Sequence, residues 1–432
     1  MKMGAIVTKV QMYLEVIKKK NEDLNIFLHV NENILNEAKV LEGKKIKGAL
    51  YGVVVAVKSN INVQGMVTNC ASKVLENYVA PYDATVIQKL KAADALIIGM
   101  VNMDEFAAGG SGENSAFGLT KNPAAPTLIP GGSSSGSAAA VAAGMCDVAL
   151  GSDTGGSIRT PASHCGVVGM KPSYGAVSRY GLIDLSMSLD QIGPLGKTVG
   201  DVAKVLEVIQ GVDAQDPTTV SYPFLSEKLK QTTVGILTIK GVAPAIQKLI
   251  DARVAAVVKK QRWKTKKVTI DSIDLAVETY YPLVYSEFFS ATRRFDGRRY
   301  GKQIEAVAGK EVLRRIYGGS EITQAEFAGK YYQKALGMKH VIADSFVEAF
   351  EQVDCIVLPT CPGLPWKLGA GTKMPLAEVY AADALTIPAN LAGCCAISVP
   401  AGEIKGVPVG LQVMCGKGED EKLLRIAKEC EL

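Results

Sequence analysis

Two short segments, GGSSSGS at residues 131–137 and DTGGSIR at residues 153–159, decide how this sequence is interpreted. Between them, the alanine-rich run 138–145 predicts a tightly packed helix of small residues, and residues 148–150 predict a short buried strand. Serines and glycines therefore gather at the start of a helix and just after a strand. Glycine lets backbone N–H groups approach a ligand closely, and a helix N-terminus favours negative charge. A turn that only caps a helix is the plain structural alternative.

Outside these segments, short apolar runs alternate with amphipathic ones, which indicates an α/β architecture. The run 51–57 is apolar and rich in β-branched residues, so we expect a strand buried on both faces. Further strands are expected at 95–101, 234–238, 355–359, 395–400 and 409–415, and helices at 3–20, 31–41, 83–93, 201–209, 243–261, 375–391 and 420–431.

Other stretches are expected to be irregular, exposed or helical. Residues 166–172 and 188–194 are punctuated by Gly and Pro, which is typical of loops that wall a site. The lysine-rich run 264–267 indicates a solvated surface, with a strand starting within 267–270, and residues 274–350 are expected to be rich in helix. Because no long linker occurs, we expect one large domain over residues 1–432, with the helices of residues 1–45 packed on its outside.

Composition narrows the class of protein. Of the 432 residues 48% are hydrophobic, which is enough for a large core. No apolar run is long enough to span a bilayer and the N-terminal segment lacks a signal-peptide core, so we expect a soluble, cytoplasmic protein without a membrane partner. The nine cysteines are scattered without any C-x-x-C pair, which indicates buried, reduced thiols rather than disulfides or a zinc site.

The charge is mildly basic. A net charge of +5 is compatible with an anionic partner such as RNA, and arginine pairs at 293–294, 298–299 and 314–315 stand among aromatic residues. Acidic residues are interleaved throughout this segment, however, and no signature of an RNA-binding module occurs. Direct RNA binding by residues 274–350 is therefore the less favoured interpretation.

One catalytic interpretation of the first segment is a nucleophile elbow. Residues 132–136 satisfy G-x-S-x-G, but that motif needs a strand leading directly into it, and the preceding residues 122–130 contain three prolines. The elbow also needs a histidine partner. None of His29, His164 and His340 stands in a recognisable catalytic loop, and each is better explained as a core or surface residue.

Two further chemistries are not supported. No lysine follows the glycines as a phosphate-binding Walker loop requires, and G-x-G-x-x-G does not occur at a strand–helix junction, so nucleotide binding is not expected. Asp104 and Glu105 are adjacent carboxylates, but neighbouring side chains on a strand or helix point apart and no His or Cys lies nearby in sequence. A structural role is expected for both, and no metal site is predicted.

A serine activated by a lysine through a second serine satisfies every requirement. A lysine acts as a base only when neutral, and bringing its pKa from about 10.4 to near 7 takes roughly 4–5 kcal/mol of bias against the charged form. Burial supplies such a bias, and Lys58 stands at the end of the apolar run 51–57. The hydroxyls of residues 133–135 offer a proton relay, and the N–H groups of residues 154–157 offer an oxyanion hole beside Ser157.

In these residues, Lys58 together with 131–134 and 153–159, and in the spacing between them, the chain resembles the amidase signature family. The resemblance implies an α/β fold in which one large mixed sheet is covered by helices on both faces, with residues 50–200 as the signature core. It also implies that Ser157 is the nucleophile, that Ser133 is a bridging cis-serine and that Lys58 is the base. The implied oxyanion hole consists of the N–H groups of Thr154, Gly155, Gly156 and Ser157.

Within that family, the chain is most similar to glutamine-hydrolysing subunits of tRNA-dependent amidotransferases. The similarity rests on residues 102–106, 109–115, 167–174, 188–194, 294–297, 314–316 and 380–393. It implies that Arg315 binds the α-carboxylate of L-glutamine and Asp383 its α-ammonium group, with Tyr280 at the side of the substrate and Gly110 and Ser111 lining the site. The neighbours Arg314 and Tyr281 stay open as alternatives. One cation and one anion in an apolar pocket suit an amino acid.

The same similarity implies partners. It implies a B subunit with kinase and transamidase activity that uses ATP and Mg²⁺, with or without a small C subunit, misacylated Glu-tRNA(Gln) or Asp-tRNA(Asn) bound through the complex, and no cofactor in this chain. Ser59 and Ser135 stand where the family usually has Asp and Gly, and the segment 300–311 is shorter than in bacterial relatives. The alternatives are a stand-alone amidase for another small amide and a non-enzymatic scaffold. The presence of all three triad residues disfavours the scaffold.

Overall fold

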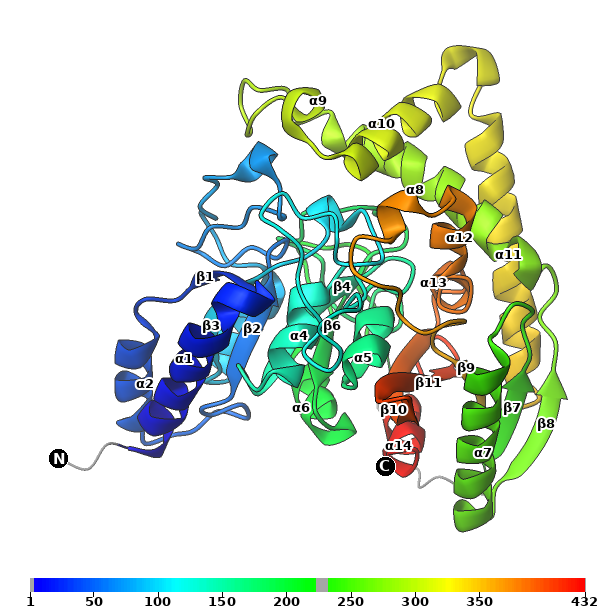
Figure 1. Cartoon of the computed structure of the whole chain (residues 1–432), viewed down its shortest axis with the longest axis horizontal. Helices are drawn as coiled ribbons and strands as arrows, with labels where there is room; N and C mark the ends of the chain where they lie inside the picture. The colour runs from blue at the N-terminus through cyan, green and yellow to red at the C-terminus, as the bar shows by residue number, and fades with distance from the viewer. Residues whose placement is uncertain (1–3, 223–231, 432) are drawn as a thin grey trace.

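The computed structural model of this chain describes residues 4–222 and 232–431. Its named strands form a single sheet of 11 strands, which runs through the molecule (Figure 1) in the order β1-β3-β2-β4-β6-β5-β10-β11-β9-β7-β8. The strands are β1 (Phe27–Val30), β2 (Val54–Lys58), β3 (Leu96–Val101), β4 (Val148–Asp153), β5 (Val168–Lys171), β6 (Gln191–Gly196), β7 (Thr233–Leu237), β8 (Lys264–Val268), β9 (Cys355–Pro359), β10 (Cys395–Ile404) and β11 (Val407–Cys415).

Helices cover both faces of the sheet, as predicted. One face packs against α3 (Thr85–Ala92), α6 (Val199–Ile209), α7 (Pro244–Gln261) and α14 (Asp420–Glu429). The other face packs against α1 (Ala5–Leu24), α2 (Ile34–Glu42), α4 (Ser135–Ala142) and α5 (Arg159–Cys165) in the N-terminal half. In the C-terminal half it packs against α8 (Ala276–Thr292), α10 (Lys310–Ile322), α11 (Lys330–Phe350) and α13 (Ile387–Leu391), with the short helices α9 (Ile304–Val307) and α12 (Leu376–Ala381) beside them.

The position of Lys58 follows from this layering. Side chains of a strand alternate between the two faces, and Val55 and Val57 of β2 belong to the core under α3 and α6. Lys58 therefore points to the opposite face, where α4 and α5 pack. Strand β2 is parallel to its neighbour β4, so Lys58 and Asp153 end these strands at the same edge of the sheet. The site predicted from the sequence thus lies at the carboxyl ends of two central strands.

The expectation that residues 166–172 and 188–194 are loops was wrong. They contain β5 and β6, two fully buried central strands that pair with each other, with β4 and with β10. The glycines that indicated a loop serve close packing instead, because a Cβ on Gly193 would lie 2.1 Å from the carbonyl oxygen of Met170. The mixed sheet depends on this pair, since β4, β6, β5 and β10 are successively antiparallel.

Three other boundaries differ from the predictions. The lysine-rich run 264–267 is itself strand β8, an edge strand with four of its five residues exposed, and charges on an edge strand discourage pairing with other chains. The predicted helix 375–391 is two helices, α12 and α13, and Pro388 stands in the first turn of α13, where its missing N–H is tolerated. The predicted helix 3–20 is α1, and residue 3 lies outside the described residues.

The remaining expectations about composition fare as follows. All nine cysteines are buried and free, which confirms the expectation of buried thiols. In the described part of the chain, no helix combines the length and apolar character needed to cross a membrane. One sheet connects the two halves, and the interpretation as a single domain over residues 1–432 stays a prediction.

Candidate active site

Lys58 lies at the centre of a buried cluster of hydroxyl groups. Its side chain is completely buried, and its Nζ donates to the hydroxyls of Ser133 and Ser152, both at 2.8 Å, and to the carbonyl oxygen of Ser152 at 3.2 Å. The bond between Gly132 and Ser133 is cis, as the family resemblance implies. A lysine and a serine from distant parts of the sequence are therefore in direct contact.

The pKa of Lys58 follows from this burial. Loss of contact with water lowers the pKa of the amine to about 7, although the carboxylates of Asp104, Asp190 and Asp153 act in the opposite direction. None of these carboxylates forms an ion pair with Lys58 among the described residues. The amine can therefore be neutral near neutral pH, which the sequence argument requires of a base.

Asp104 supports the serine loop from below. Its carboxylate accepts hydrogen bonds from the N–H groups of Gly112 and Asn114, both at 2.9 Å, and its own N–H donates to the carbonyl oxygen of Ser133. A Cβ on Gly132 would lie 2.0 Å from the Asp104 carboxylate, so glycine is required there. Glu105 points elsewhere, toward Ser72 and Gly309. Both carboxylates therefore have the structural role expected.

Ser157 stands on the second loop, next to the first. The N–H of Ser134 donates to the carbonyl oxygen of Ser157 at 3.1 Å, and Ser157 is 8% exposed. The N–H groups of Gly155 and Ser157 have no hydrogen-bond partner within residues 4–222 and 232–431, so they can bind an oxyanion. The N–H of Gly156 donates to Asp153 Oδ1 at 2.9 Å, so in this conformation Gly156 does not fit the predicted set.

Thr154 is held from another side. Its hydroxyl donates to the buried carboxylate of Asp190 at 2.6 Å, and the N–H groups of Leu185 and Ser186 donate to the other carboxylate oxygen. Burial raises the pKa of Asp190 to about 6, and the hydrogen bond from Thr154 opposes this change. The side chain of Thr154 therefore anchors the loop to the segment that leads into β6.

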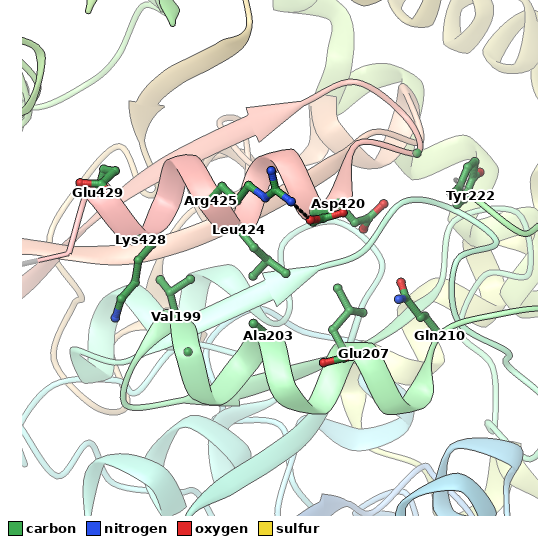
Figure 2. A pocket seen from close by; sticks show the side chains of 14 residues that line it. Val199, Ala203, Glu207, Gln210, Tyr222, Asp420, Leu424, Arg425, Lys428 and Glu429 are labelled. Atoms are coloured by element: carbon green, nitrogen blue, oxygen red, sulfur yellow. Dashed lines mark hydrogen bonds and ion pairs between the residues drawn. The ribbon is translucent and has the colours of Figure 1, made fainter. Parts of the chain in front are cut away.

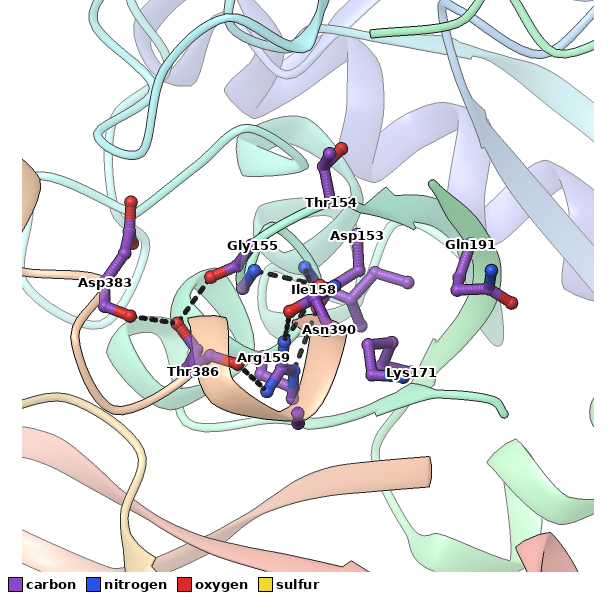
Figure 3. A network of polar contacts seen from close by, with 12 residues as sticks. Asp153, Thr154, Gly155, Ile158, Arg159, Lys171, Gln191, Asp383, Thr386 and Asn390 are labelled. Atoms are coloured by element: carbon purple, nitrogen blue, oxygen red, sulfur yellow. Dashed lines mark hydrogen bonds and ion pairs between the residues drawn. The ribbon is translucent and has the colours of Figure 1, made fainter. Parts of the chain in front are cut away.

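An ion pair between Asp153 and Arg159 holds the base of the nucleophile loop (Figure 3). Both side chains are fully buried, and two guanidinium nitrogens of Arg159 donate to the two carboxylate oxygens at 2.9 and 3.0 Å. Burial alone would raise the pKa of Asp153, but the positive charge of Arg159 and its hydrogen bonds hold it well below the usual value. Arg159 also donates to Thr386, Asn390 and Gln412, which joins the loop to the C-terminal third of the chain.

Beside this loop lies an enclosed cavity of about 210 Å³. Four of the predicted substrate residues line it, namely Gly110, Ser111, Arg315 and Asp383. The predicted Tyr280 does not line it but packs against Gly155, where a Cβ would lie 2.7 Å from the tyrosine hydroxyl. The alternative, Tyr281, does line the cavity and stacks on Tyr380 with ring centroids 3.7 Å apart.

Arg315 and Arg314 differ sharply. The side chain of Arg315 is 4% exposed and its Nε donates to Glu311 at 3.0 Å, whereas the side chain of Arg314 is 45% exposed and pairs with the same carboxylate. Within the described ranges, the two terminal nitrogens of Arg315 have no hydrogen-bond partner, and neither does the carboxylate of Asp383. Burial raises the pKa of Asp383 to about 7, and Arg315 opposes this change. An unpaired cation and an unpaired anion therefore face one cavity.

The structure also brings in residues that the sequence did not single out. Ser152, Thr386, Asn390 and Gln412 touch Lys58 or the nucleophile loop, yet each is an ordinary polar residue at a long sequence distance from its partner. Burial of so many polar side chains in contact with one loop is visible only after folding.

Other parts of the molecule offer less chemistry. A hollow of about 540 Å³ lies between α6 and α14 (Figure 2), on the face of the sheet opposite to Lys58. Its floor is apolar, and Arg425 on its rim pairs with Glu421 of the same helix. In the described part of the chain no three His, Cys, Asp or Glu side chains are grouped so that they could hold a metal ion. His164 is buried and His340 is exposed, in keeping with the interpretation of these residues as core or surface.

Comparison with known proteins identifies relatives over nearly the whole chain. Residues 8–424 match the family model described as amidase. The chain is 53% identical to the A subunit of glutamyl-tRNA(Gln) amidotransferase from Methanocaldococcus jannaschii, covering 97% of each chain. It is 50% identical to the protein of the same name from Methanothermobacter thermautotrophicus, covering 97% of this chain and 94% of that one. It matches the crystal structure of the same amidotransferase component from Thermotoga maritima with a TM-score of 0.85 and 40% identity, covering 98% and 91% of the two chains.

The ion pair under the nucleophile loop generates a stability prediction. Replacing Arg159 by Met leaves the carboxylate of Asp153 buried without its cation, which costs about 3–5 kcal/mol of unfolding free energy. Arg314→Met, which removes an exposed pair, costs about 0–1 kcal/mol. Urea denaturation measures both. A loss for Arg159→Met no larger than that for Arg314→Met would contradict the role given to the buried pair.

Proposed function

The chain belongs to the amidase family, and from that membership we propose that it hydrolyses L-glutamine as the ammonia-producing subunit of a tRNA-dependent amidotransferase. The match over residues 8–424 confirms the family predicted from the serine and glycine segments. The proposed activity agrees with the name that the relatives from Methanocaldococcus jannaschii and Thermotoga maritima carry.

One observation carries the choice of substrate. Arg315 and Asp383 turn unpaired, opposite charges toward one enclosed cavity beside Ser157, and no ion pair joins them in the described part of the chain. A free α-amino acid carries the two complementary charges on its α-carboxylate and α-ammonium groups. Buried charges are costly unless paired, so a ligand that pairs both is strongly favoured. This supports glutamine over a simple amide without an amino acid head.

The proposed acylation uses Ser157 as the nucleophile. Its hydroxyl oxygen attacks the side-chain amide carbon of glutamine, while its proton passes through the hydroxyl of Ser133 to the neutral amine of Lys58. The negative charge on the amide oxygen is held by the N–H groups of Gly155 and Ser157. Collapse of the tetrahedral intermediate breaks the carbon–nitrogen bond, and Lys58 returns the proton through Ser133 to the leaving nitrogen as ammonia forms.

The proposed deacylation repeats these steps with water. A water molecule attacks the glutamyl ester on Ser157, and its proton passes through Ser133 to Lys58. When the ester bond breaks, the proton returns to the oxygen of Ser157, and L-glutamate leaves. Ser152 assists by accepting hydrogen bonds from Lys58 at its carbonyl and hydroxyl oxygens. Two N–H bonds of the neutral amine are thereby engaged, and its lone pair is left for the hydroxyl of Ser133.

We place this chain in a complex on the strength of its relatives' name. In the proposal, ammonia passes to a B subunit that activates the side-chain carboxylate of Glu-tRNA(Gln) with ATP and Mg²⁺, with or without a small C subunit. The name of the relatives favours Glu-tRNA(Gln) as the acceptor over Asp-tRNA(Asn). No cofactor is assigned to this chain.

Ammonia release tests the proposal. The wild type is expected to release ammonia from L-glutamine, faster with the B subunit and acylated tRNA, and to leave acetamide and propionamide nearly untouched. Ser157→Ala is expected to lose about 10⁴-fold or more in turnover, because the nucleophile is absent. Ser290→Ala, an exposed serine on α8, serves as the control that keeps wild-type activity. Turnover of simple amides by the isolated chain, with glutamine ignored, would favour the stand-alone amidase instead.

The charge pair in the cavity gives a second prediction. Arg315→Met removes the cation proposed to bind the α-carboxylate, so KM for glutamine is expected to rise at least about 30-fold, which corresponds to roughly 2 kcal/mol. Arg314→Met, on the neighbouring exposed side chain, is expected to change KM less than about fivefold. Steady-state kinetics with glutamine decides between them. Equal effects of the two substitutions, or a larger one for Arg314→Met, would overturn the assignment.

A further inference from the structure

The break between α12 and α13 brings Thr386 against the nucleophile loop (Figure 3). Thr386 is fully buried, and its hydroxyl donates to the carbonyl oxygen of Gly155 at 2.7 Å. The contact is close, because a Cβ on Gly156 would lie 2.2 Å from that hydroxyl. A side chain from the C-terminal third of the chain thus touches the backbone beside Ser157.

The hydroxyl of Thr386 does not have the usual role of its position. Thr386 is the N-cap of α13, and an N-cap threonine ordinarily accepts a hydrogen bond from an N–H in the first helical turn. Here no such bond forms, and the second residue of the helix is Pro388, which has no N–H. The hydroxyl is directed to Gly155 instead. Helix capping therefore does not explain the residue.

The peptide group between Gly155 and Gly156 is consequently held at both ends. Its carbonyl oxygen accepts from Thr386, and its N–H donates to Asp153 Oδ1 at 2.9 Å. Glycine has wide backbone freedom, and Gly156 has φ +138°, so this peptide would otherwise be free to rotate. Its orientation decides where the neighbouring N–H groups of Gly155 and Ser157 point.

The same residue is tied to the substrate cavity. The hydroxyl of Thr386 lies 3.1 Å from the carbonyl oxygen of Asp383, its N–H donates to that oxygen at 3.0 Å, and its own carbonyl accepts from Arg159 at 2.8 Å. The carboxylate of Asp383 faces the cavity. One short turn therefore links the group proposed to bind the α-ammonium with the peptide that orients the oxyanion hole.

We propose that Thr386 is a positioning residue, which sets the oxyanion-binding N–H groups of Gly155 and Ser157 at a fixed place relative to Asp383. The inference rests on the proposed function, since it concerns the reaction of an amino acid amide at Ser157. Thr386 touches no reacting atom. It acts through the Gly155–Gly156 peptide, so its loss affects the tetrahedral intermediate more than the binding of substrate or product.

The test compares Thr386→Val with Thr386→Ser and with Thr360→Val. Valine keeps the shape of threonine and removes the hydroxyl, serine keeps the hydroxyl, and Thr360 is another fully buried threonine whose hydroxyl bonds to Ser398 on β10. We expect Thr386→Val to lower kcat for glutamine about 10- to 100-fold, with KM changed less than about threefold. Thr386→Ser and Thr360→Val are expected to stay within about threefold of the wild-type kcat.

Binding measurements give a readout that a merely structural loss would not reproduce. The boronic acid 2-amino-4-boronobutanoate accepts the oxygen of Ser157 on boron and forms a tetrahedral adduct, whereas L-glutamate binds without one. We expect Thr386→Val to weaken the boronate by the same factor as kcat and to change the Kd of L-glutamate less than about threefold. Titration of active sites with the wild-type boronate complex as reference corrects for misfolded protein, and Thr386→Ala replaces Thr386→Val if the latter does not fold.

The outcomes are distinct. A kcat for Thr386→Val within threefold of wild type, or equal weakening of boronate and glutamate, overturns the inference. If the wild type hydrolyses another amide and ignores glutamine, the proposed function fails, and the same three variants are compared on the amide that is hydrolysed. A selective loss of kcat for Thr386→Val there still supports the positioning role, and an unchanged kcat overturns it.

Discussion

A lysine amine without a carboxylate partner, buried at the end of a central strand, is the constraint on which the rest of the site depends. Charging Lys58 in this position is costly, so the amine is available as a base near neutral pH. Its burial requires β2 to lie between two parallel strands, and its hydrogen bonds require the serine loop on one side and Ser152 of β4 on the other. The mixed sheet thus brings together residues that are far apart in the sequence.

A second constraint is the buried charge that surrounds this amine. Asp153 is neutralised by Arg159, and Asp104 by backbone N–H groups, so these two carboxylates stabilise loops. Asp383 and Arg315 differ from them because each keeps free hydrogen-bonding atoms that face the cavity. The contrast separates charges that hold the fold from charges that await a ligand. Thr386 connects the two sets, since it contacts the loop that Asp153 supports and follows Asp383 by one turn.

Much of the site could be predicted from sequence, because its chemistry depends on residues within two short segments and on one lysine after an apolar run. The strands at 95–101, 355–359 and 409–415 were also predictable, since buried strands are continuous apolar stretches. Strands β5 and β6 were not, because Gly193 and Pro194 are typical of loops until the close approach of Met170 is known. Arg314 and Arg315 could not be separated, because only the turn of α10 decides which one is buried.

The pH dependence of kcat/KM for glutamine tests the central claim, a neutral Lys58 as base, most directly. Protonation of the amine removes the base, so activity should be lost as the pH falls through about 7. Because burial also raises the pKa of Asp383 to about 7, the profile is measured in Asp383→Asn as well, in which that carboxyl cannot titrate. The account predicts that the limb near pH 7 persists in this variant. A profile that stays flat down to pH 5.5, or that rises only above pH 10, would contradict it.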